Sequence, residues 1–404
     1  MQLIDYLKSP ELVIEFQTFF GVKYLKHSDD RTDHDCRLHK RNASDHSSTG
    51  SSETDEGFIE PKEFDKESVQ PYEITNKFWY WLFVIATELG DEIFYATMIP
   101  FWLWNVDGYV GRRVVFVWAI VMYVGQGLKD IIRWPRPGPP VHRLQKKWGL
   151  EYGLPSTHAM VSFSMPFSVV IFMLDRYQFS FVTGLVISTV WCSLICLSRL
   201  YLGMHSVLDI IAGLILTICL MIPLVPMVDY LDHIILSSPL SPLFVLAISI
   251  LLIVYYPSPG KWTPTRGDTT MTISVTAGIQ IGAWLNYQLN LLAAPTTEPP
   301  YEIIWPTYRM LGLLLLRTTL GLCSVLATRA IAKSISYAFV CALLGKDKNE
   351  LRNSENTLEN RDKTIVELCY KYFTCGMIGF NTVYLLPNVF KLIGIGRPDF
   401  YTEI

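Results

Sequence analysis

Charged residues are scarce in this 404-residue sequence. They make up 18% of the chain, whereas hydrophobic residues make up 50%; typical soluble domains have about 25% charged residues. The net charge is only -3, so no basic excess indicates a nucleic-acid partner. We therefore expect a protein that crosses a membrane several times and binds no nucleic acid.

Several motifs of metal- and nucleotide-dependent proteins are also absent. The eight cysteines form no pair of Cys-x-x-Cys motifs, and the sequence has neither a Walker A motif nor HExxH. Strand-like alternation and repeats at solenoid periods are missing. No cleavable signal peptide is evident, because Glu15 and Gln17 interrupt the apolar run 12–22.

The chain divides by composition into two parts. Residues 1–76 are expected to be a mostly disordered N-terminal tail, since 31–60 is rich in Ser, Asp, His and Arg. Within this tail, 3–22 could form a short amphipathic helix at a membrane surface, and Asn42 begins a glycosylation sequon. Residues 77–404 are expected to form a polytopic membrane domain with its core at about 78–230.

Apolar segments recur throughout the second part, and aromatic residues cluster at their edges, as at membrane boundaries. We expect an all-α membrane bundle of about nine transmembrane helices, although several segments are shorter than the ~20 residues of a full span. Segment 331–345 is expected to lie in the interface. The nine segments are 78–104, 113–128, 158–174, 179–197, 206–228, 239–256, 271–292, 309–330 and 367–394.

A histidine and a carboxylate stand together where a polar loop enters an apolar segment. His205 and Asp209 are four residues apart, which places them on one face of a helix. The carboxylate can accept a hydrogen bond from Nδ1–H, leave Nε2 with a lone pair and stabilise positive charge on the ring. That suits a histidine nucleophile, although a capped helix start is the ordinary alternative. Arg199 lies just before them in the sequence. It could bind phosphate, or it could be a basic residue that flanks the membrane.

A second cluster opens the segment that begins near His158. Ser156 or Thr157 is a natural N-cap, and the free N–H groups of a helix start form an anion site. A protonated His158 beside an anion could donate a proton to a leaving alkoxide. Taken alone, this cluster also fits a plain capped helix.

A third cluster supplies cations. Lys129 ends an apolar segment and Arg136 stands between two prolines, so both could bind phosphate or simply flank the membrane. Counting the crossings places all three clusters on one membrane face. Such cations and helix N-termini can stabilise a phosphoryl transition state without a metal or other cofactor, so we expect a phosphate-ester hydrolysis site.

Three acidic residues offer a rival reading. Glu88, Asp91 and Glu92 share one face of the first expected span. They could bind a metal, or they could pair with basic residues in the bundle, because unpartnered charges in membranes are costly.

Together, the clusters resemble the three-part signature of the type 2 phosphatidic acid phosphatase (PAP2) superfamily. The usual second motif is Pro-Ser-Gly-His; Thr157 replaces the glycine here, a variation typical of the sphingosine-1-phosphate phosphatase branch. The segments 122–126, 154–160, 196–205 and 264–270 also look close to that branch. The resemblance covers roughly residues 75–290, and the C-terminal third more weakly.

The resemblance implies a role for each cluster. His205 would be the nucleophile that forms a phosphohistidine, Asp209 would orient it, and His158 would donate a proton to the leaving group. The phosphate would be held by Lys129, Arg136, Ser156, Thr157 and Arg199.

The resemblance also implies a substrate, sphingosine 1-phosphate or dihydrosphingosine 1-phosphate, whose tail could remain in the bilayer. Alternatives are a broader lipid phosphate or polyprenyl pyrophosphate phosphatase, and a non-catalytic transporter or lipid scaffold. Self-association into homo-oligomers stays open.

The implied location is the endoplasmic reticulum membrane with a lumenal site. Arg143, Lys146 and Lys147 lie on the same face and favour a cytosolic site by the positive-inside rule. Because catalysis itself requires several cations, we expect the lumenal orientation, with Asn42 glycosylated.

Overall fold

The computed structural model confirms an all-α membrane protein. It describes residues 2–24, 72–145, 151–257, 263–292, 295, 297–345 and 361–403. In these residues the only sheet is a short antiparallel pair, β1 (Val22–Tyr24) and β2 (Tyr72–Ile74). Asn42 and most of the expected N-terminal tail lie outside the described residues.

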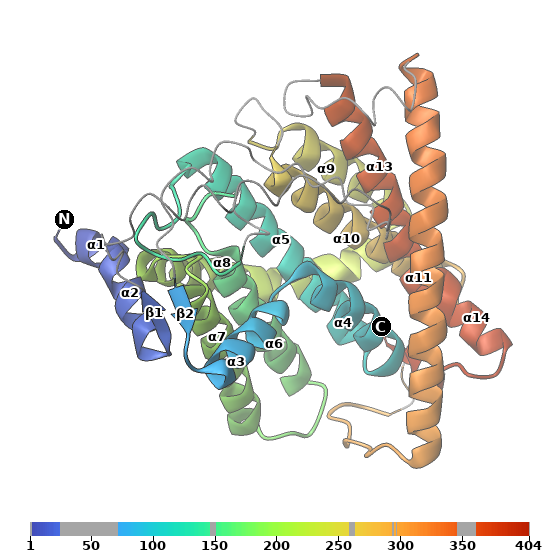
Figure 1. The fold of residues 1–404 in the computed structure, drawn as a ribbon. Helices are drawn as coiled ribbons and strands as arrows, with labels where there is room; N and C mark the ends of the chain where they lie inside the picture. Colours follow the sequence, from blue (N-terminus) through green and yellow to red (C-terminus); the bar gives the residue numbers. More distant parts are fainter. Residues whose placement is uncertain are drawn as a thin grey trace, which may run out of the picture.

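Helices form the rest of the fold, and Figure 1 shows them packed side by side, with α11 along one edge. After the N-terminal segment they are α3 (Lys77–Glu88), α4 (Glu92–Asn105), α5 (Gly108–Ile132), α6 (Thr157–Leu174), α7 (Phe181–Tyr201), α8 (Val207–Ser237), α9 (Ser241–Val254), α10 (Pro264–Gln288), α11 (Tyr308–Leu343), α13 (Arg361–Phe380), the π-helical η1 (Asn381–Leu385), α14 (Leu386–Leu392) and the 3-10 turn η2 (Pro398–Thr402).

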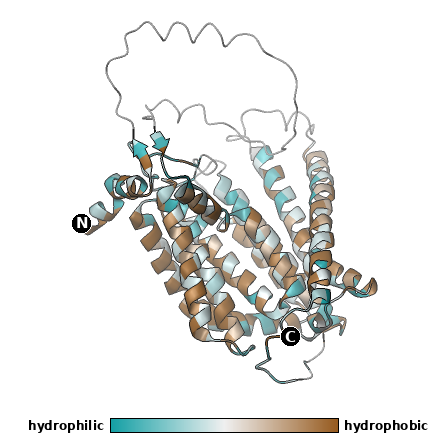
Figure 2. Cartoon of the chain, turned by 60° about the horizontal axis from the view of Figure 1, so that its bottom comes forward, coloured by the Kyte–Doolittle hydropathy of each residue, from teal (hydrophilic) through white to brown (hydrophobic). Residues whose placement is uncertain are grey.

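Five helices in the described part of the chain are long and apolar enough to cross a membrane: α5, α6, α7, α8 and α11. Nine spans are therefore not shown. Helix α9 has 14 residues, fewer than the ~20 that span a bilayer. Helix α10 has 25 residues, but its threonines and glycines make it less apolar. Large hydrophobic side chains on the long helices are exposed, among them Leu185, Ile222 and Leu315, as lipid contact requires. Figure 2 shows long brown, hydrophobic stretches along the bundle.

Several of the expected segments were wrong in their boundaries; segment 206–228, for example, belongs to α8, which continues to Ser237. The expected helix 78–104 is two helices, α3 and α4, because Gly90 separates them and the Asp91 carboxylate caps the second by accepting the Glu92 N–H at 2.8 Å. Segment 331–345, expected in the interface, instead continues α11, which has 36 residues.

The N-terminal segment packs on the bundle. The expected short helix is present as α1 (Gln2–Lys8) and α2 (Pro10–Phe19). Fully buried Gln17 donates its side-chain N–H groups to the carbonyls of His142 and Tyr201, at 2.9 and 2.8 Å. Lys8 lies over the ring of Trp134. The start of the chain is thus fixed to the end of the bundle at which α7 finishes.

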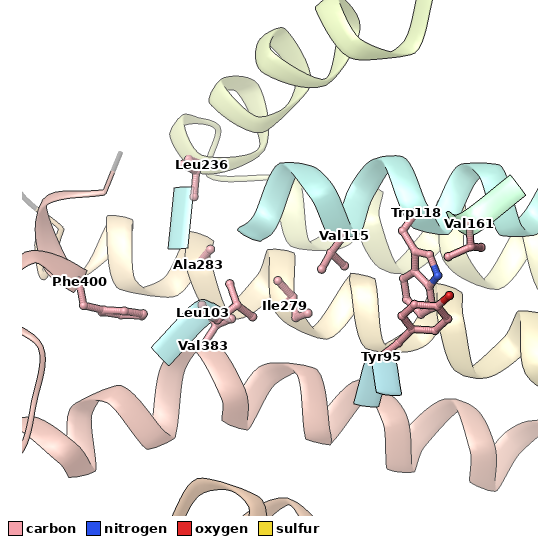
Figure 3. Close-up of a cluster of buried hydrophobic side chains, with 10 residues drawn as sticks. All are labelled: Tyr95, Leu103, Val115, Trp118, Val161, Leu236, Ile279, Ala283, Val383 and Phe400. Atoms are coloured by element: carbon pink, nitrogen blue, oxygen red, sulfur yellow. The ribbon is translucent and has the colours of Figure 1, made fainter. Parts of the chain in front are cut away.

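A buried apolar cluster joins α4, α5 and α10 in the centre of the bundle (Figure 3). The rings of Tyr95 and Trp118 lie with their centroids 5.9 Å apart, and Val115 and Ile279 extend the contact along the helices. Burial of such side chains stabilises a fold by about 1.5–3 kcal/mol each. This packing fixes the position of α5, whose last turn carries Lys129 of the cationic cluster.

Candidate active site

All three sequence clusters meet at one end of the bundle. Helices α5 and α7 end there, and α6 and α8 begin there. Helix α6 contacts α5, α7 and α8, so the polar residues at these four helix ends are neighbours. The structure brings together Lys129, Arg136, Ser156, Thr157, His158, Arg199, His205 and Asp209. The three clusters thus lie at one end of the bundle, and that this end lies at a single membrane face stays a prediction.

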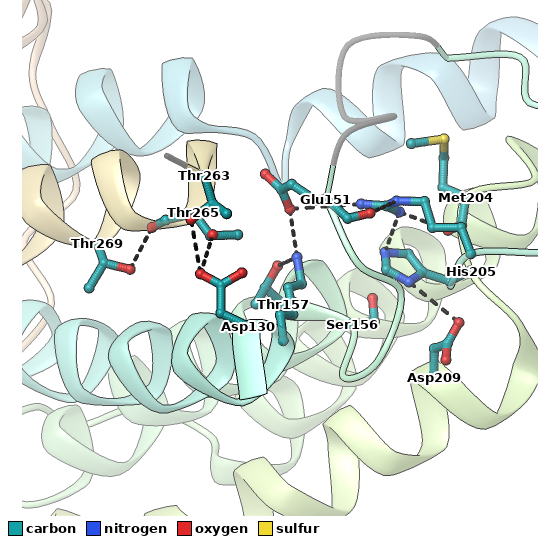
Figure 4. Close-up of polar contacts among 12 residues, drawn as sticks. Asp130, Glu151, Ser156, Thr157, Met204, His205, Asp209, Thr263, Thr265 and Thr269 are labelled. Carbon is teal, nitrogen blue, oxygen red and sulfur yellow. Dashed lines mark hydrogen bonds and ion pairs between the residues drawn. The ribbon is translucent and has the colours of Figure 1, made fainter. Parts of the chain in front are cut away.

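Arg136 is held by backbone carbonyls from two loops. Its Nε donates to the carbonyl of Glu151 at 2.8 Å, and its Nη1 donates to the carbonyl of Met204 at 2.7 Å. The same Nη1 lies 3.2 Å from Nε2 of His205 (Figure 4). Burial lowers the pKa of Arg136 to about 10, so it remains a cation at neutral pH.

Lys129 is fully buried and has two partners. Its ammonium donates to a Glu151 carboxylate oxygen at 2.7 Å and to the Thr157 hydroxyl at 2.9 Å. The Glu151 carboxylate also lies 3.7 Å from Nη2 of Arg136. Sequence reasoning missed Glu151 because no motif contains it; its only signal was an acidic residue between two cationic clusters.

Arg199 is fully buried, and only one of its guanidinium nitrogens forms hydrogen bonds within the part of the chain that the structure describes. Its Nη1 donates to the Thr87 hydroxyl at 2.6 Å and to the side-chain oxygen of Gln145 at 2.9 Å. Among the described residues, its Nε and Nη2 have no hydrogen-bond acceptor. Two neighbouring N–H donors without acceptors match the edge of a phosphate. Thr87 and Gln145 were not predicted, since neither belongs to a cluster.

His205 and Asp209 face each other at the start of α8, but the expected hydrogen bond is absent. Nδ1 of His205 and Oδ2 of Asp209 are 3.7 Å apart, an ion-pair distance that is too long for a hydrogen bond. Oδ2 instead accepts the Ser206 N–H at 2.8 Å, while the Ser206 hydroxyl accepts the Asp209 N–H in a reciprocal capping box.

Burial and the surrounding cations favour the neutral form of the His205 imidazole. Burial, with repulsion from Arg136, Arg199 and Lys129, lowers the pKa of His205 well below its usual value. Because Arg136 can only donate, its approach to Nε2 selects the tautomer with the lone pair on Nε2 and the proton on Nδ1, toward Asp209. This is the tautomer that a nucleophilic Nε2 requires.

The second cluster has the predicted helix cap. Ser156 is the N-cap of α6 and accepts the Ala159 N–H at 3.4 Å, while its own N–H donates to the Asp209 carbonyl at 3.1 Å. Ser156 thereby joins the starts of α6 and α8. His158 lies in the first turn of α6, where a Cβ added at Gly90 would come within 3.2 Å of its ring. The interruption between α3 and α4, at Gly90, therefore leaves room for the His158 imidazole.

A cavity of about 260 Å³ opens beside these residues. It lies between α1 and the loop after α5, and its lining includes Asp5, Lys8, Trp134, Arg136 and Ser206. It gives access from outside the bundle to the Arg136 loop, past both charged and apolar side chains.

The rival acidic group does not form a metal site. Within the described ranges, no three His, Cys, Asp or Glu side chains are arranged to hold a metal ion, and this includes Glu88, Asp91 and Glu92. Asp91 caps α4. The chain has one spacing typical of thiol phosphatases, Cys323-x5-Arg329, but it lies inside α11 and so forms no phosphate-binding loop.

Comparison with known proteins agrees with this geometry. Residues 111–232 match the PAP2 superfamily. The chain is 39% identical over 324 residues to sphingosine-1-phosphate phosphatase 1 of Rattus norvegicus, covering 80% of this chain and 74% of the relative. It is 38% identical over 330 residues to sphingosine-1-phosphate phosphatase 2 of Homo sapiens, covering 81% of each.

A more distant relative is a dihydrosphingosine 1-phosphate phosphatase of Schizosaccharomyces pombe, 27% identical over 266 residues, with 63% of this chain and 62% of the relative covered. No solved structure is significantly similar to the chain. The identity to the rat and human proteins extends well beyond the matched superfamily segment, over about four fifths of the chain. The chain therefore belongs to the PAP2 superfamily and, within it, to the family of the sphingosine-1-phosphate phosphatases.

Proposed function

We propose that this protein hydrolyses sphingosine 1-phosphate and dihydrosphingosine 1-phosphate to the long-chain base and phosphate, with His205 as nucleophile. The observation that carries the proposal is the arrangement of a neutral, buried histidine among three cations at one end of a membrane bundle. Arg136 lies 3.2 Å from its Nε2, and Arg199 has N–H donors to spare among the described residues. The names of the relatives support the sphingoid substrate.

The first step forms a phosphoenzyme. The phosphate binds Lys129, Arg136 and the open donors of Arg199, with the start of α6 at Ser156 and Thr157 adding its positive end. When Arg136 turns its Nη1 to a phosphate oxygen, Nε2 of His205 is released to attack phosphorus. The P–O bond to the lipid breaks, and protonated His158 gives its proton to the leaving alkoxide.

The second step releases phosphate. Neutral His158 takes a proton from water as the water oxygen attacks phosphorus, and the P–N bond breaks with its electron pair returning to Nε2. Asp209 stabilises the positive ring of His205 in both steps, since it lies 3.7 Å from Nδ1. The cations replace a metal as stabilisers of the charge on the transferring phosphoryl group.

The site also suits a substrate embedded in a bilayer. Helices α5, α6, α7 and α8 carry the clusters at their ends and are apolar enough to span a membrane. A lipid tail beside them can stay in the bilayer while its head group reaches the helix ends. We place this end of the bundle on the lumenal side of the endoplasmic reticulum membrane.

Glycosylation of Asn42 would report the membrane orientation of the proposed site. Residue 42 lies between β1 and β2 in the sequence. These strands pair, and Val22 of β1 packs in one apolar cluster with Leu202 and Met204, next to His205. Residues 25–71 contain no apolar run that could cross a bilayer. A glycosidase-sensitive band shift that disappears in Asn42→Gln would indicate a lumenal site, and protease access to residues 25–71 in sealed microsomes would indicate a cytosolic one.

Phosphate release from a panel of lipids tests the activity. Purified protein should act on sphingosine 1-phosphate in preference to phosphatidate and polyprenyl pyrophosphate. Labelled substrate should leave a trapped phosphoenzyme in the wild type but not in His205→Ala. Labelling of His205→Ala would show that another residue is the nucleophile, and preference for phosphatidate or the pyrophosphate would replace the sphingoid assignment. Folded protein without activity on the panel would support a transporter or scaffold.

A further inference from the structure

A carboxylate occupies the centre of this phosphate-binding site. Glu151 is 9% exposed, and one of its oxygens, Oε2, lies 2.7 Å from the Lys129 ammonium and 3.7 Å from the Arg136 guanidinium. These are two of the cations that would hold the substrate phosphate. In the protein without substrate, the Glu151 oxygen therefore takes a place that a phosphate oxygen would take.

An anion at this position is a disadvantage for a general phosphatase. A phosphate that displaces Glu151 from its cations leaves a charged carboxylate in a buried site, and an unpaired buried charge is costly. Protonation does not readily remove the charge: burial raises the pKa of Glu151, but attraction to Lys129 and Arg136 is stronger and holds it below its usual value. The displaced carboxylate needs a new cation.

A phosphorylated sphingoid base carries such a cation. Its C1 bears the phosphate and its neighbouring C2 bears a primary ammonium, so the positive charge enters the site one carbon away from the phosphoryl ester. Phosphatidate, lysophosphatidate and polyprenyl pyrophosphate have no amine. A carboxylate beside the phosphate site would attract the first class of substrate and repel the others.

We propose that Glu151 determines substrate specificity by exchanging Lys129 and Arg136 for the ammonium group of a 1-phosphorylated 2-amino alcohol. This proposal rests on the proposed function, because it assumes that the phosphate binds Lys129 and Arg136. The Glu151 backbone stays anchored through its carbonyl, which accepts from Nε of Arg136 at 2.8 Å, so only the side chain must turn. Phosphates without an amine leave the carboxylate unpaired and react slowly.

The test compares two substrates in two variants. Sphingosine 1-phosphate and its N-acetyl derivative share a chain and a phosphate, but acetylation removes the ammonium charge. In the wild type, kcat/KM should favour the free amine, and in Glu151→Gln this ratio should fall at least tenfold, with the N-acetyl substrate unchanged or faster. Exposed Glu302, beyond α10, provides the control Glu302→Gln, which should keep the wild-type ratio.

Equal losses on both substrates would show that Glu151 only stabilises the cations, and equal gains would show that it only blocks the site; either result overturns the proposal. If the wild type does not hydrolyse sphingosine 1-phosphate at all, the proposed function itself fails. A second measurement requires no variant. Phosphoethanolamine should inhibit the wild type at a concentration at least tenfold lower than ethyl phosphate does, and equal inhibition would contradict an ammonium site.

Discussion

The imidazole of His205 and the carboxylate of Asp209 are neighbours without a hydrogen bond between them. Their closest polar atoms are 3.7 Å apart, because Oδ2 of Asp209 is oriented by the Ser206 N–H. The pair nevertheless places a negative charge beside Nδ1. Positive charge that forms on the ring when Nε2 attacks would bring the two groups together, since the attraction exists only after the ring is charged.

The substitution Asp209→Asn removes the negative charge beside Nδ1 of His205 but keeps the size of the side chain. The amide oxygen can still accept the Ser206 N–H, so the helix cap remains and the melting temperature should stay close to that of the wild type. Turnover should fall by several orders of magnitude, as for a comparable orienting aspartate that contributes about 10⁴. Vanadate affinity should hardly change, because Asp209 does not bind the phosphate. Near-normal turnover in Asp209→Asn would show that Asp209 is only a helix cap.

The two arginines of the proposed phosphate site should have different effects when they are replaced. Arg199→Ala removes open donors and should weaken vanadate binding about tenfold or more, since charge-assisted hydrogen bonds contribute about 1.5–3 kcal/mol each. Arg136→Ala should weaken binding too, and should also lower the melting temperature more, because it removes contacts to the carbonyls of Glu151 and Met204. Equal melting temperatures for the two variants would contradict this distinction.

Chelation should leave the activity intact. In the proposed mechanism, Lys129, Arg136 and Arg199 supply the positive charge that a metal provides in other phosphatases. Phosphate release in excess EDTA should match the untreated rate within about twofold. Activity that disappears in EDTA and returns with magnesium would contradict this prediction and would favour Glu88, Asp91 and Glu92 as metal ligands.

The low pKa of His205 predicts a loss of stability in mild acid. The unfolded chain protonates this histidine near pH 6.5, whereas the folded protein does not. The unfolded state therefore binds more protons, and the free energy of unfolding falls as pH drops below 6.5, by up to ~1.4 kcal/mol per pH unit. The lowered pKa of Glu151 acts only in stronger acid, below pH 4.5.

Melting temperatures at pH 7.5 and 5.5 measure this effect. Between these values, His205→Asn should lose less stability than the wild type, because asparagine does not titrate. The same decrease in both proteins would mean that other groups cause the pH dependence.

Sequence reasoning identified the polar residues that lie together at one end of the bundle, because helix termini carry local signals. Ser156 as a cap and the four-residue spacing of His205 and Asp209 depend on neighbours within one or two turns. Counting the membrane crossings between the clusters then predicted that all three lie on one face. These features are encoded locally, so no packing information was needed.

The features that were missed depend on tertiary contacts. Glu151 belongs to the site only because the fold brings Lys129 and Arg136 next to its carboxylate. Thr87 contacts Arg199 from a different helix. The division between α3 and α4 follows from a single glycine and a cap inside an otherwise apolar run. Hydropathy alone predicts that run as one span. That the His158 imidazole packs against Gly90 can be known only from the three-dimensional structure.

The attachment of the chain's first helices to the catalytic end turns the N-terminus into an orientation marker. Gln17 bonds to the backbone of His142 and Tyr201, and both carbonyls border the catalytic loops. The first residues and the reacting phosphate must then face the same compartment. An epitope tag joined to residue 2 would report on which side of the membrane phosphate is released, without any assay of turnover.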